Sequence, residues 1–254
     1  MKKSNFILIF ATVLLLCGCT REKIKMRGTI KDYDGNIYFT VQIGDQVWMK
    51  ENMRTKRFAD GTPLRSFNQR STKPSYASKD PAEVKYNGIA AQYKKDPLSK
   101  YTQGVCPNGW HLPSVSEWQE LVNYYKEHPE IWDHEGVGNL SQALMSRDFS
   151  KDEYNFSALP KGYTYGLLQK TASPEIFGVR DESAAMFWAV GYDTNYPTTD
   201  FVEPPVYFPP FYEFSKDSDW PHANLCRIKA NKEEPEMTSF NDRHYCSVRC
   251  VKDK

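Results

Sequence analysis

The stretch VCPNGWHLPSVSEWQELV, residues 105–122, decides most of the fold. Its residues 107–109, Pro-Asn-Gly, have the composition of a tight turn. Ser114 and Glu117 follow at the spacing of a capping box, in which each side chain accepts a hydrogen bond from the other residue's backbone N–H. A helix is therefore predicted to begin near Val115.

The apolar residues of this predicted helix share one face. Trp118, Leu121, Val122 and Tyr125 are spaced at i, i+3, i+4 and i+7. Pro129 ends the pattern because proline cannot continue a helix. Such a stripe is typical of a helix packed on a core, with Trp118 as its largest anchor.

A hairpin is predicted upstream. Apolar and polar residues alternate through residues 37–43, which is the period of a half-buried strand, and residues 46–49 can return as its partner. Gly44 and Asp45 between them have turn chemistry.

The rest of the chain is less regular. Residues 65–100 are polar and predict a long surface loop, residues 135–145 a short second helix, residues 184–190 a buried strand and residues 245–251 a closing strand. Residues 203–214, EPPVYFPPFYEF, interleave prolines with aromatic residues, which excludes a central strand. One main helix on antiparallel strands, with long loops, predicts an α+β fold.

The N-terminus resembles a bacterial lipoprotein signal. Lys2 and Lys3 precede a short apolar run, residues 6–16, and the sequence Leu-Cys-Gly-Cys at 16–19 resembles a lipobox. The resemblance implies cleavage before Cys19 and attachment of acyl chains such as palmitate to it, which gives a stable membrane anchor. We therefore expect a signal peptide at 1–18 and a location on the bacterial outer membrane.

Charge and composition exclude several classes of protein. Removing residues 1–18 from the 254-residue chain leaves 236 residues and changes the formal charge from +1 to −1, because two lysines and no acids are lost. This balance gives no electrostatic footprint for nucleic acid. With 40% hydrophobic and 14% aromatic residues, the chain is not disordered throughout.

Four cysteines remain after Cys17 leaves with the signal and Cys19 takes lipid. An even number in an exported chain favours disulfides, and four cysteines allow three pairings. A zinc site is disfavoured because no Cys-x-x-Cys pair is present. The four are Cys106, Cys226, Cys246 and Cys250.

Several blocks resemble the Fibrobacter succinogenes major paralogous domain family of bacterial lipoproteins. They are residues 32–62, 105–122, 155–163 and 245–253. The resemblance covers nearly the whole mature chain and implies a signal at 1–18, a lipid-anchored tether at 19–29 and one domain at 30–254.

The same blocks suggest a more specific fold. Residues 111–118 and 247–251 resemble the helix motif and closing strand of formylglycine-generating enzymes, and the order of cysteines is similar to that of C-type lectin-like domains. This resemblance implies a C-type lectin-like fold with two disulfides, Cys106–Cys250 and Cys226–Cys246.

The sequence contains no complete catalytic motif. His111 is expected to be packed or hydrogen-bonded, and no His-Glu-x-x-His, Gly-x-Ser-x-Gly or phosphate-loop pattern is present. The C-terminal cysteines raise an alternative, an oxidoreductase of the formylglycine-generating type. Their Cys-x-x-x-Cys spacing and the closing-strand position of Cys250 favour structural bonds instead.

Calcium is the only cofactor that the sequence hints at. Asn241 and Asp242 resemble the Trp-Asn-Asp motif of sugar-binding lectins, and Glu203 resembles their Glu-Pro-Asn. The spacing differs and one asparagine is missing, so no cofactor is predicted. Asp32 and Asp34 resemble part of a calcium loop without its later ligands, and we interpret them as a hairpin turn.

These features predict a non-enzymatic, lipid-anchored binding module of the cell envelope, whose partner is a glycan or a protein. A structural surface or fibre component is a third hypothesis. The proline-aromatic segment is the predicted contact surface, because its prolines restrict the loop and its rings offer rigid apolar area. Those rings are Tyr207, Phe208, Phe211 and Tyr212.

Overall fold

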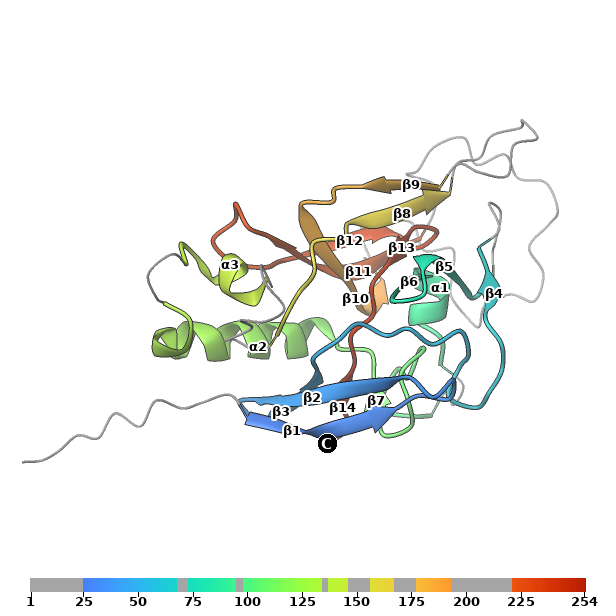
Figure 1. The fold of residues 1–254 in the computed structure, drawn as a ribbon, viewed down its shortest axis with the longest axis horizontal. Coiled ribbons are helices and arrows are strands. Elements are labelled where there is room, and N and C mark those ends of the chain that lie inside the picture. The colour runs from blue at the N-terminus through green and yellow to red at the C-terminus, as the bar shows by residue number, and fades with distance from the viewer. Residues whose placement is uncertain are drawn as a thin grey trace, which may run out of the picture.

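The computed structural model describes residues 25–67, 73–94, 98–133, 137–145, 156–166, 177–192 and 221–254. These residues form short, mostly antiparallel strands and a few helices, which confirms the predicted mixture of helix and sheet (Figure 1). Within them the strands make three sheets, and one disulfide is present.

The first sheet joins the two ends of the described chain. Its strand order is β1 (Lys25–Lys31), β2 (Ile37–Ile43), β3 (Gln46–Met49), β14 (Val251–Lys252) and β7 (Trp110–His111). All of its pairs are antiparallel. β2 and β3 have the bounds that the alternation predicted, and the late strand β14 lies between β3 and β7.

The structure describes the last five residues, 25–29, of the segment predicted as a tether, 19–29. β1 already pairs with β2 from Lys25, with an irregularity in register between Met26 and Gly28. Residues 25–31 carry little apolar patterning, so their strand conformation comes from backbone pairing with β2. Six residues, 19–24, separate the predicted signal peptide from the first strand.

Two further sheets build the other side of the molecule (Figure 1). One has the order β10 (Ala184–Tyr192), β11 (His222–Lys229) and β12 (Glu236–Asn241), and β10 contains the predicted buried strand. The other has the order β4 (Arg65–Ser66), β5 (Ser75–Asp80), β6 (Glu83–Asn87), β13 (Tyr245–Cys246), β8 (Tyr163–Gly166) and β9 (Phe177–Arg180).

The prediction of a surface loop over residues 65–100 is wrong. Three strands and the short helix α1 (Gly88–Ala91) lie there, and β6 is largely buried. Polar residues of this segment can be buried because they are hydrogen-bonded within the protein. Lys85 Nζ donates to the carbonyl of Lys161 at 2.5 Å, and Asn87 accepts from the Ala90 backbone N–H at 3.0 Å to cap α1.

The main helix has the predicted start. In α2 (Val115–Glu127), the Ser114 hydroxyl accepts from the Glu117 N–H at 3.2 Å, and the Glu117 carboxylate accepts from the Ser114 N–H at 2.9 Å. The chain then turns into a 3-10 helix, Pro129–Ile131. The predicted second helix is shorter than expected, since α3 covers Leu140–Leu144.

The buried residues form two clusters on opposite sides of the β10–β11–β12 sheet. Phe187 and Cys226 point to the cluster beneath α2, while the adjacent Trp188 and Leu225 point to the cluster around the disulfide. We call them the helix cluster and the disulfide cluster. The largest members of the helix cluster are Trp48, Trp118, Tyr125, Phe156 and Phe187, and those of the disulfide cluster are Tyr38, Tyr86, Trp110 and Trp188.

The predicted closing strand, 245–251, is two strands in different sheets. β13 pairs with β6 and β8, and β14 pairs with β3 and β7. Between them Arg249 is 1% exposed and Cys250 is bonded to Cys106. This short segment therefore joins the two strand systems through the core.

Candidate functional site

A groove lies between α2 and the β2–β3 turn. It is open to solvent and has a volume of about 1100 Å³. Gly44 allows the close approach that shapes one wall: its φ is +55°, and a Cβ there would lie 2.9 Å from Cδ2 of the Tyr124 ring. The groove is lined by Gln42, Ile43, Gly44, Asp45, Val115, Ser116, Gln119, Glu120, Asn123, Tyr124 and Glu127.

The lining of the groove is rich in hydrogen-bonding groups. The Gln119 amide donates to Asn123 Oδ1 at 3.1 Å, and the Gln42 amide donates to the carbonyl of Gly44 at 2.9 Å. The described lining includes carboxylates but no Lys or Arg. Amides, carboxylates and a tyrosine suit a hydroxyl-rich or positively charged ligand, and do not suit an anion.

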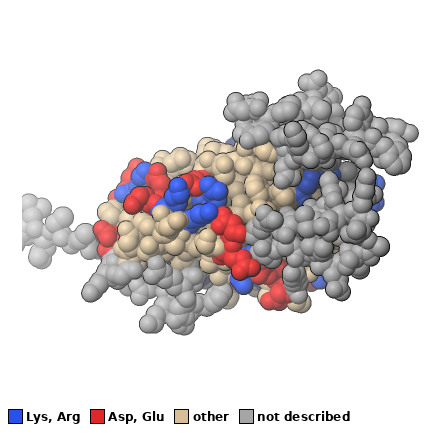
Figure 2. All heavy atoms as spheres, turned by 90° about the horizontal axis from the view of Figure 1, so that it is seen from above, with Lys and Arg blue, Asp and Glu red and all other residues tan. Residues whose placement is uncertain are grey.

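Charges are mixed elsewhere on the surface. On the coloured part of the face seen in Figure 2, Lys and Arg side chains alternate with Asp and Glu side chains. This face shows no basic patch of the kind that binds nucleic acid.

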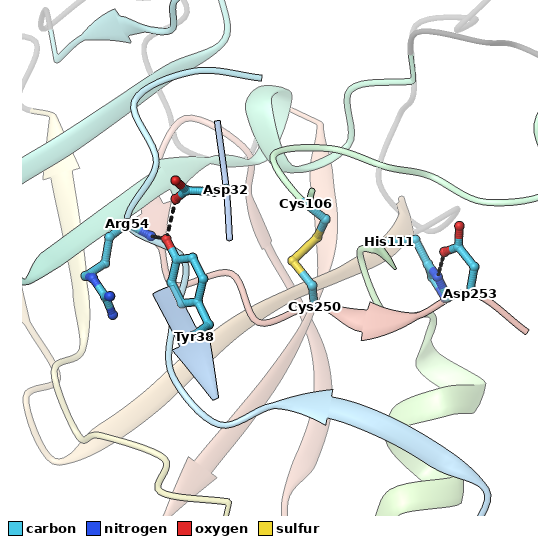
Figure 3. Close-up of a disulfide and its surroundings, with 7 residues drawn as sticks. All are labelled: Asp32, Tyr38, Arg54, Cys106, His111, Cys250 and Asp253. Atoms are coloured by element: carbon cyan, nitrogen blue, oxygen red, sulfur yellow. Dashed lines mark hydrogen bonds and ion pairs between the residues drawn. A yellow bond between two sulfur atoms is a disulfide. The ribbon is translucent and has the colours of Figure 1, made fainter. Parts of the chain in front are cut away.

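His111 is a junction between three segments, as predicted for a packed histidine. Its Nδ1 lies 2.7 Å from Asp253 Oδ1 (Figure 3). Its Nε2 lies 2.9 Å from Glu117 Oε1, so an imidazolium donates to both carboxylates. The Tyr101 ring stacks on the imidazole with centroids 4.1 Å apart. The histidine is 2% exposed, and both ring nitrogens are engaged.

The two carboxylates set the protonation of this junction. Burial alone would lower the pKa of His111, but the hydrogen bonds and negative charges of Glu117 and Asp253 outweigh it and raise that pKa. Burial would raise the pKa of Glu117, but the bonds from His111 and the Ser114 backbone lower it to about 2. The junction is therefore a partly buried ionic network of one histidine and two carboxylates that ties α2 to β7 and the residues after β14.

Asp242, one of the calcium candidates, is a buried acid. It is 2% exposed, its backbone carbonyl accepts from the Gly88 N–H at 2.7 Å, and its Oδ1 lies 3.6 Å from Arg243 Nε. Burial raises the pKa of the Asp242 carboxyl to about 7, and Arg243 opposes this only in part.

The other calcium candidates do not join Asp242 in the described structure. The neighbouring Asn241 accepts from the Arg243 N–H at 2.9 Å, while Glu203 lies outside the described residues. The described part of the chain contains no group of three or more His, Cys, Asp or Glu side chains that could hold a metal ion.

The Asp32–Asp34 segment is a turn, as interpreted from the sequence. The Gly35 N–H donates to the Asp32 carbonyl at 3.1 Å. The Tyr38 hydroxyl donates to the Asp32 carboxylate at 2.6 Å and accepts from the Arg54 N–H at 2.8 Å (Figure 3). Asp34 accepts from the side chains of Thr55 and Arg57. Their ligand oxygens are thus already bound within the protein.

One predicted disulfide is present and the other is not. Cys106 and Cys250 are bonded, whereas Cys226 and Cys246 are free and buried. The prediction of a Cys226–Cys246 bridge is wrong because the two thiols lie on opposite sides of the β10–β11–β12 sheet. Cys226 belongs to the helix cluster and Cys246 to the disulfide cluster.

The cysteine geometry weighs against the oxidoreductase alternative. Cys250 is already bonded to Cys106, and burial raises the pKa of the Cys246 thiol far above its usual value, with only a partial opposing effect from Lys85. A buried neutral thiol lacks the activation that redox catalysis requires.

Sequence reasoning missed Arg249, although it stands in the closing block SVRCV. Its guanidinium donates to Asn52 Oδ1 at 2.6 Å and to the carbonyl of Phe156, and it lies 4.5 Å and 5.1 Å from the ring centroids of Phe156 and Phe187. An arginine held between rings and carbonyls stabilises the segment between β13 and β14. The available signal was a basic residue between two cysteines, Cys246 and Cys250, in an otherwise buried block.

Several predicted site residues lie outside the described residues. These are the lipidation site Cys19, the calcium candidate Glu203 and the aromatic residues Tyr207, Phe208, Phe211 and Tyr212. In the part that is described, no helix is long and apolar enough to cross a membrane.

Among the comparisons with known proteins, a single family model identifies the domain. No curated protein and no solved structure matches the sequence. The model of the Fibrobacter succinogenes major domain matches residues 41–252, which include β3, β7, β14, α2 and the disulfide but not β1. The chain therefore belongs to the Fibrobacter succinogenes major domain family.

Proposed function

We propose that this protein is a lipid-anchored binding module of the bacterial outer membrane, held there through Cys19 and without enzymatic activity. The observation that supports binding most directly is the groove of about 1100 Å³ beside α2. Its Gln119, Glu120 and Asn123 side chains are exposed, with Gln119 bonded to Asn123 and Glu120 3.5 Å from Lys254 Nζ, whereas His111 and Arg249 are occupied inside the protein.

A glycan is the ligand class that the groove suits best. Sugar hydroxyls donate to carboxylates and accept from side-chain amides, and Gln119, Glu120 and Asn123 offer both kinds of group on one helix face. A protein partner contacting the proline-aromatic segment, 203–214, is the second form of the same proposal.

We further propose a C-type lectin-like arrangement of the domain. Its support is the position of Cys106 just before the main helix, its bond to Cys250 just before a closing strand, and the shared sheet of β1 and β14. The sequence resemblance gave the same order of elements.

Membrane attachment is tested by fractionation. A Cys19→Ser variant should move from the membrane pellet to the soluble fraction, because the acyl chains supply the anchor. A variant that stays in the pellet unchanged would contradict the anchor.

Glycan binding is tested on the mature chain with an array of cell-envelope oligosaccharides. Gln119→Ala combined with Asn123→Ala should weaken binding by about tenfold or more, since two side chains that bond the ligand are lost. Asn231→Ala, at an exposed position in the β11–β12 turn, is the control and should bind normally.

Deletion of 204–212 separates the two forms of the proposal. If the deletion abolishes binding and the groove variants do not, the partner contacts the proline-aromatic segment. If neither change affects binding of any envelope glycan or protein, the binding function is wrong. Repeating the assay with a calcium chelator tests whether Asn241, Asp242 and Glu203 contribute.

A further inference from the structure

Exposed apolar side chains gather on the β1–β2 hairpin. Ile37 and Phe39 are 56% and 50% exposed, and Tyr33 at the hairpin turn is 59% exposed. Ile37 and Phe39 alternate with the buried Tyr38, so they share a face of β2. The later residues of that face, Val41 and Ile43, are covered by the helix cluster. The first half of the strand thus leaves its apolar face open.

Basic side chains surround this open face. Lys31 is paired in register with Ile37, and both Lys31 and Arg27 are exposed. No ion pair to either of them is found among the described residues. Arg54 donates to the carbonyl of Ile37 at 3.1 Å, but its guanidinium lies 4.6 Å from the centroid of the Tyr38 ring and therefore on the opposite face of β2.

The acids nearby are bound within the protein. Glu51 accepts from the Phe39 N–H at 2.8 Å, and Asp34 is ion-paired with Arg57 at 3.0 Å. A surface of exposed apolar side chains next to exposed Lys and Arg side chains has the composition that binds the interface of an anionic bilayer.

The distance to the proposed anchor limits where this face can be. Five residues lie between Cys19 and Lys25, the first residue of β1. Even fully extended, they span only about 20 Å. β1 and β2 form the layer of the molecule opposite β8 and β9 (Figure 1). With Cys19 acylated, this layer is therefore held close to the bilayer surface.

We propose that Ile37 and Phe39, together with Arg27 and Lys31, form a membrane-contact face that rests on anionic lipid headgroups. The inference depends on the acylation of Cys19 proposed above. It goes beyond the anchor because it fixes the orientation of the domain. Gln42, which lines the groove, pairs with Lys25, so the groove lies at the end of the hairpin that follows the Cys19 tether, while Ile37 lies at the other end.

In the test, the lipid is coupled chemically to the protein, so that membrane attachment does not depend on lipoprotein processing in cells. The chain from Cys19 to Lys254 is coupled through its Cys19 thiol to a maleimide lipid in vesicles of phosphatidylethanolamine and phosphatidylglycerol. Cys226 and Cys246 are buried and do not compete. Phe39→Trp supplies a fluorescent probe on the face, and brominated phospholipids quench tryptophan at short range.

The matched control is Asn231→Trp, an exposed position in the turn after β11. Ser141 bonds to this turn from α3, which lies on the other side of α2 from β1 (Figure 1). Each signal is read as the difference from the unsubstituted chain, because the other tryptophans are present in all samples.

The expected result is at least threefold stronger quenching of the probe at 39 than of the probe at 231. Replacing Arg27 and Lys31 by glutamine, or omitting phosphatidylglycerol, should reduce the quenching at 39 by half or more. Equal quenching at both positions, or none at 39, overturns the membrane-contact face. If a second, crosslinked copy of the chain covers the probe at 39 and the lipid does not quench it, this face is a protein interface and the membrane-contact proposal is overturned.

Failure of this proposal is distinguishable from failure of the anchor. Absence of quenching in the coupled protein rejects the contact face and leaves acylation in cells untouched. An unchanged Cys19→Ser fractionation rejects the anchor, whatever the coupled protein shows.

Discussion

The two buried clusters are held together by different interactions. In the helix cluster, Trp118 packs against Trp48 with ring centroids 4.8 Å apart, and its Nε1 has no hydrogen-bond partner among the described residues. In the disulfide cluster, Trp188 donates to the carbonyl of Tyr86 at 2.7 Å, and the Tyr86 hydroxyl donates to the carbonyl of Thr55 at 2.8 Å. Aromatic packing around the buried Arg249 dominates the helix cluster, whereas long-range polar bonds and a covalent link hold the disulfide cluster.

This difference has a consequence for substitution. Apolar packing tolerates a change of shape when volume is conserved, whereas a buried bond leaves an unsatisfied partner when one side is removed. The two sides of the β10–β11–β12 sheet should therefore respond differently to similar substitutions.

The largest expected effect is on the disulfide cluster. Replacing Cys106 and Cys250 by alanine should lower the free energy of unfolding by about 5 kcal/mol, because the bond spans 144 residues and restricts the unfolded chain. Denaturant titration of the oxidised protein and of the double variant measures this difference. A loss below about 1 kcal/mol would show that polar bonds alone hold the cluster.

Thiol counting is the control for that experiment. Cys226 and Cys246 should be unreactive in the native protein and should give two thiols in denaturant, because both are buried and free. A count of zero would restore the second disulfide that the sequence predicted.

The next effect belongs to the helix cluster. Trp118→Ala should cost roughly 3–5 kcal/mol because the ring is fully buried among aromatic neighbours. Chemical denaturation followed by circular dichroism measures it.

Phenylalanine substitutions sharpen the comparison between the two tryptophans. Trp188→Phe should cost about 1 kcal/mol more than Trp118→Phe, since only Trp188 loses a hydrogen bond to a buried carbonyl. Equal costs would mean that both clusters depend on packing alone.

The His111 junction should make stability depend on pH. Its raised pKa contributes stability below about pH 6.5, and this is lost as pH rises through the folded pKa. The lowered pKa of Glu117 contributes stability above pH 4.5, and this is lost as pH falls towards about 2. Both stabilising contributions are therefore complete between pH 4.5 and about pH 6.5.

His111→Gln should accordingly cost about 2 kcal/mol at pH 5.5 and less at pH 9. Denaturation at both pH values measures the loss. His128→Gln, at a partly exposed histidine that pairs with Glu130, is the matched control and should change stability little. If His111→Gln lowers the free energy of unfolding equally at both pH values, His111 contributes through packing and not through its charge.

The smallest effect is at the helix start. Ser114→Ala should cost about 1 kcal/mol, because the hydroxyl that accepts from Glu117 N–H is lost. Ser116→Ala, which removes only the neighbouring hydroxyl 2.9 Å from that of Ser114, is the comparison. A loss at Ser114 no larger than at Ser116 would mean that the cap does not stabilise α2.

The helix cluster was largely predictable from the sequence, and the disulfide cluster was not. The apolar spacing of α2 and the alternation in β2 are local patterns, and each gave the correct element. Lys85 and Asn87 of β6 are buried because they bond to partners elsewhere in the chain. The polar sequence of this segment therefore wrongly predicted a loop.

The candidate site divides in the same way. The capping box, the environment of His111 and the Cys106–Cys250 bond agree with what the motifs or the family resemblance implied. The groove needed the structure, because it is formed where the β2–β3 turn meets a helix about seventy residues later, and no single segment contains it.

The position of β14 affects when the protein can fold. β14 lies between β3 and β7 in the first sheet, yet it begins at Val251, long after β3 ends at Met49. During vectorial synthesis or translocation, the central gap of that sheet stays unfilled until residue 252 has emerged. The late strand thus delays completion of the native state until almost the whole chain has been made.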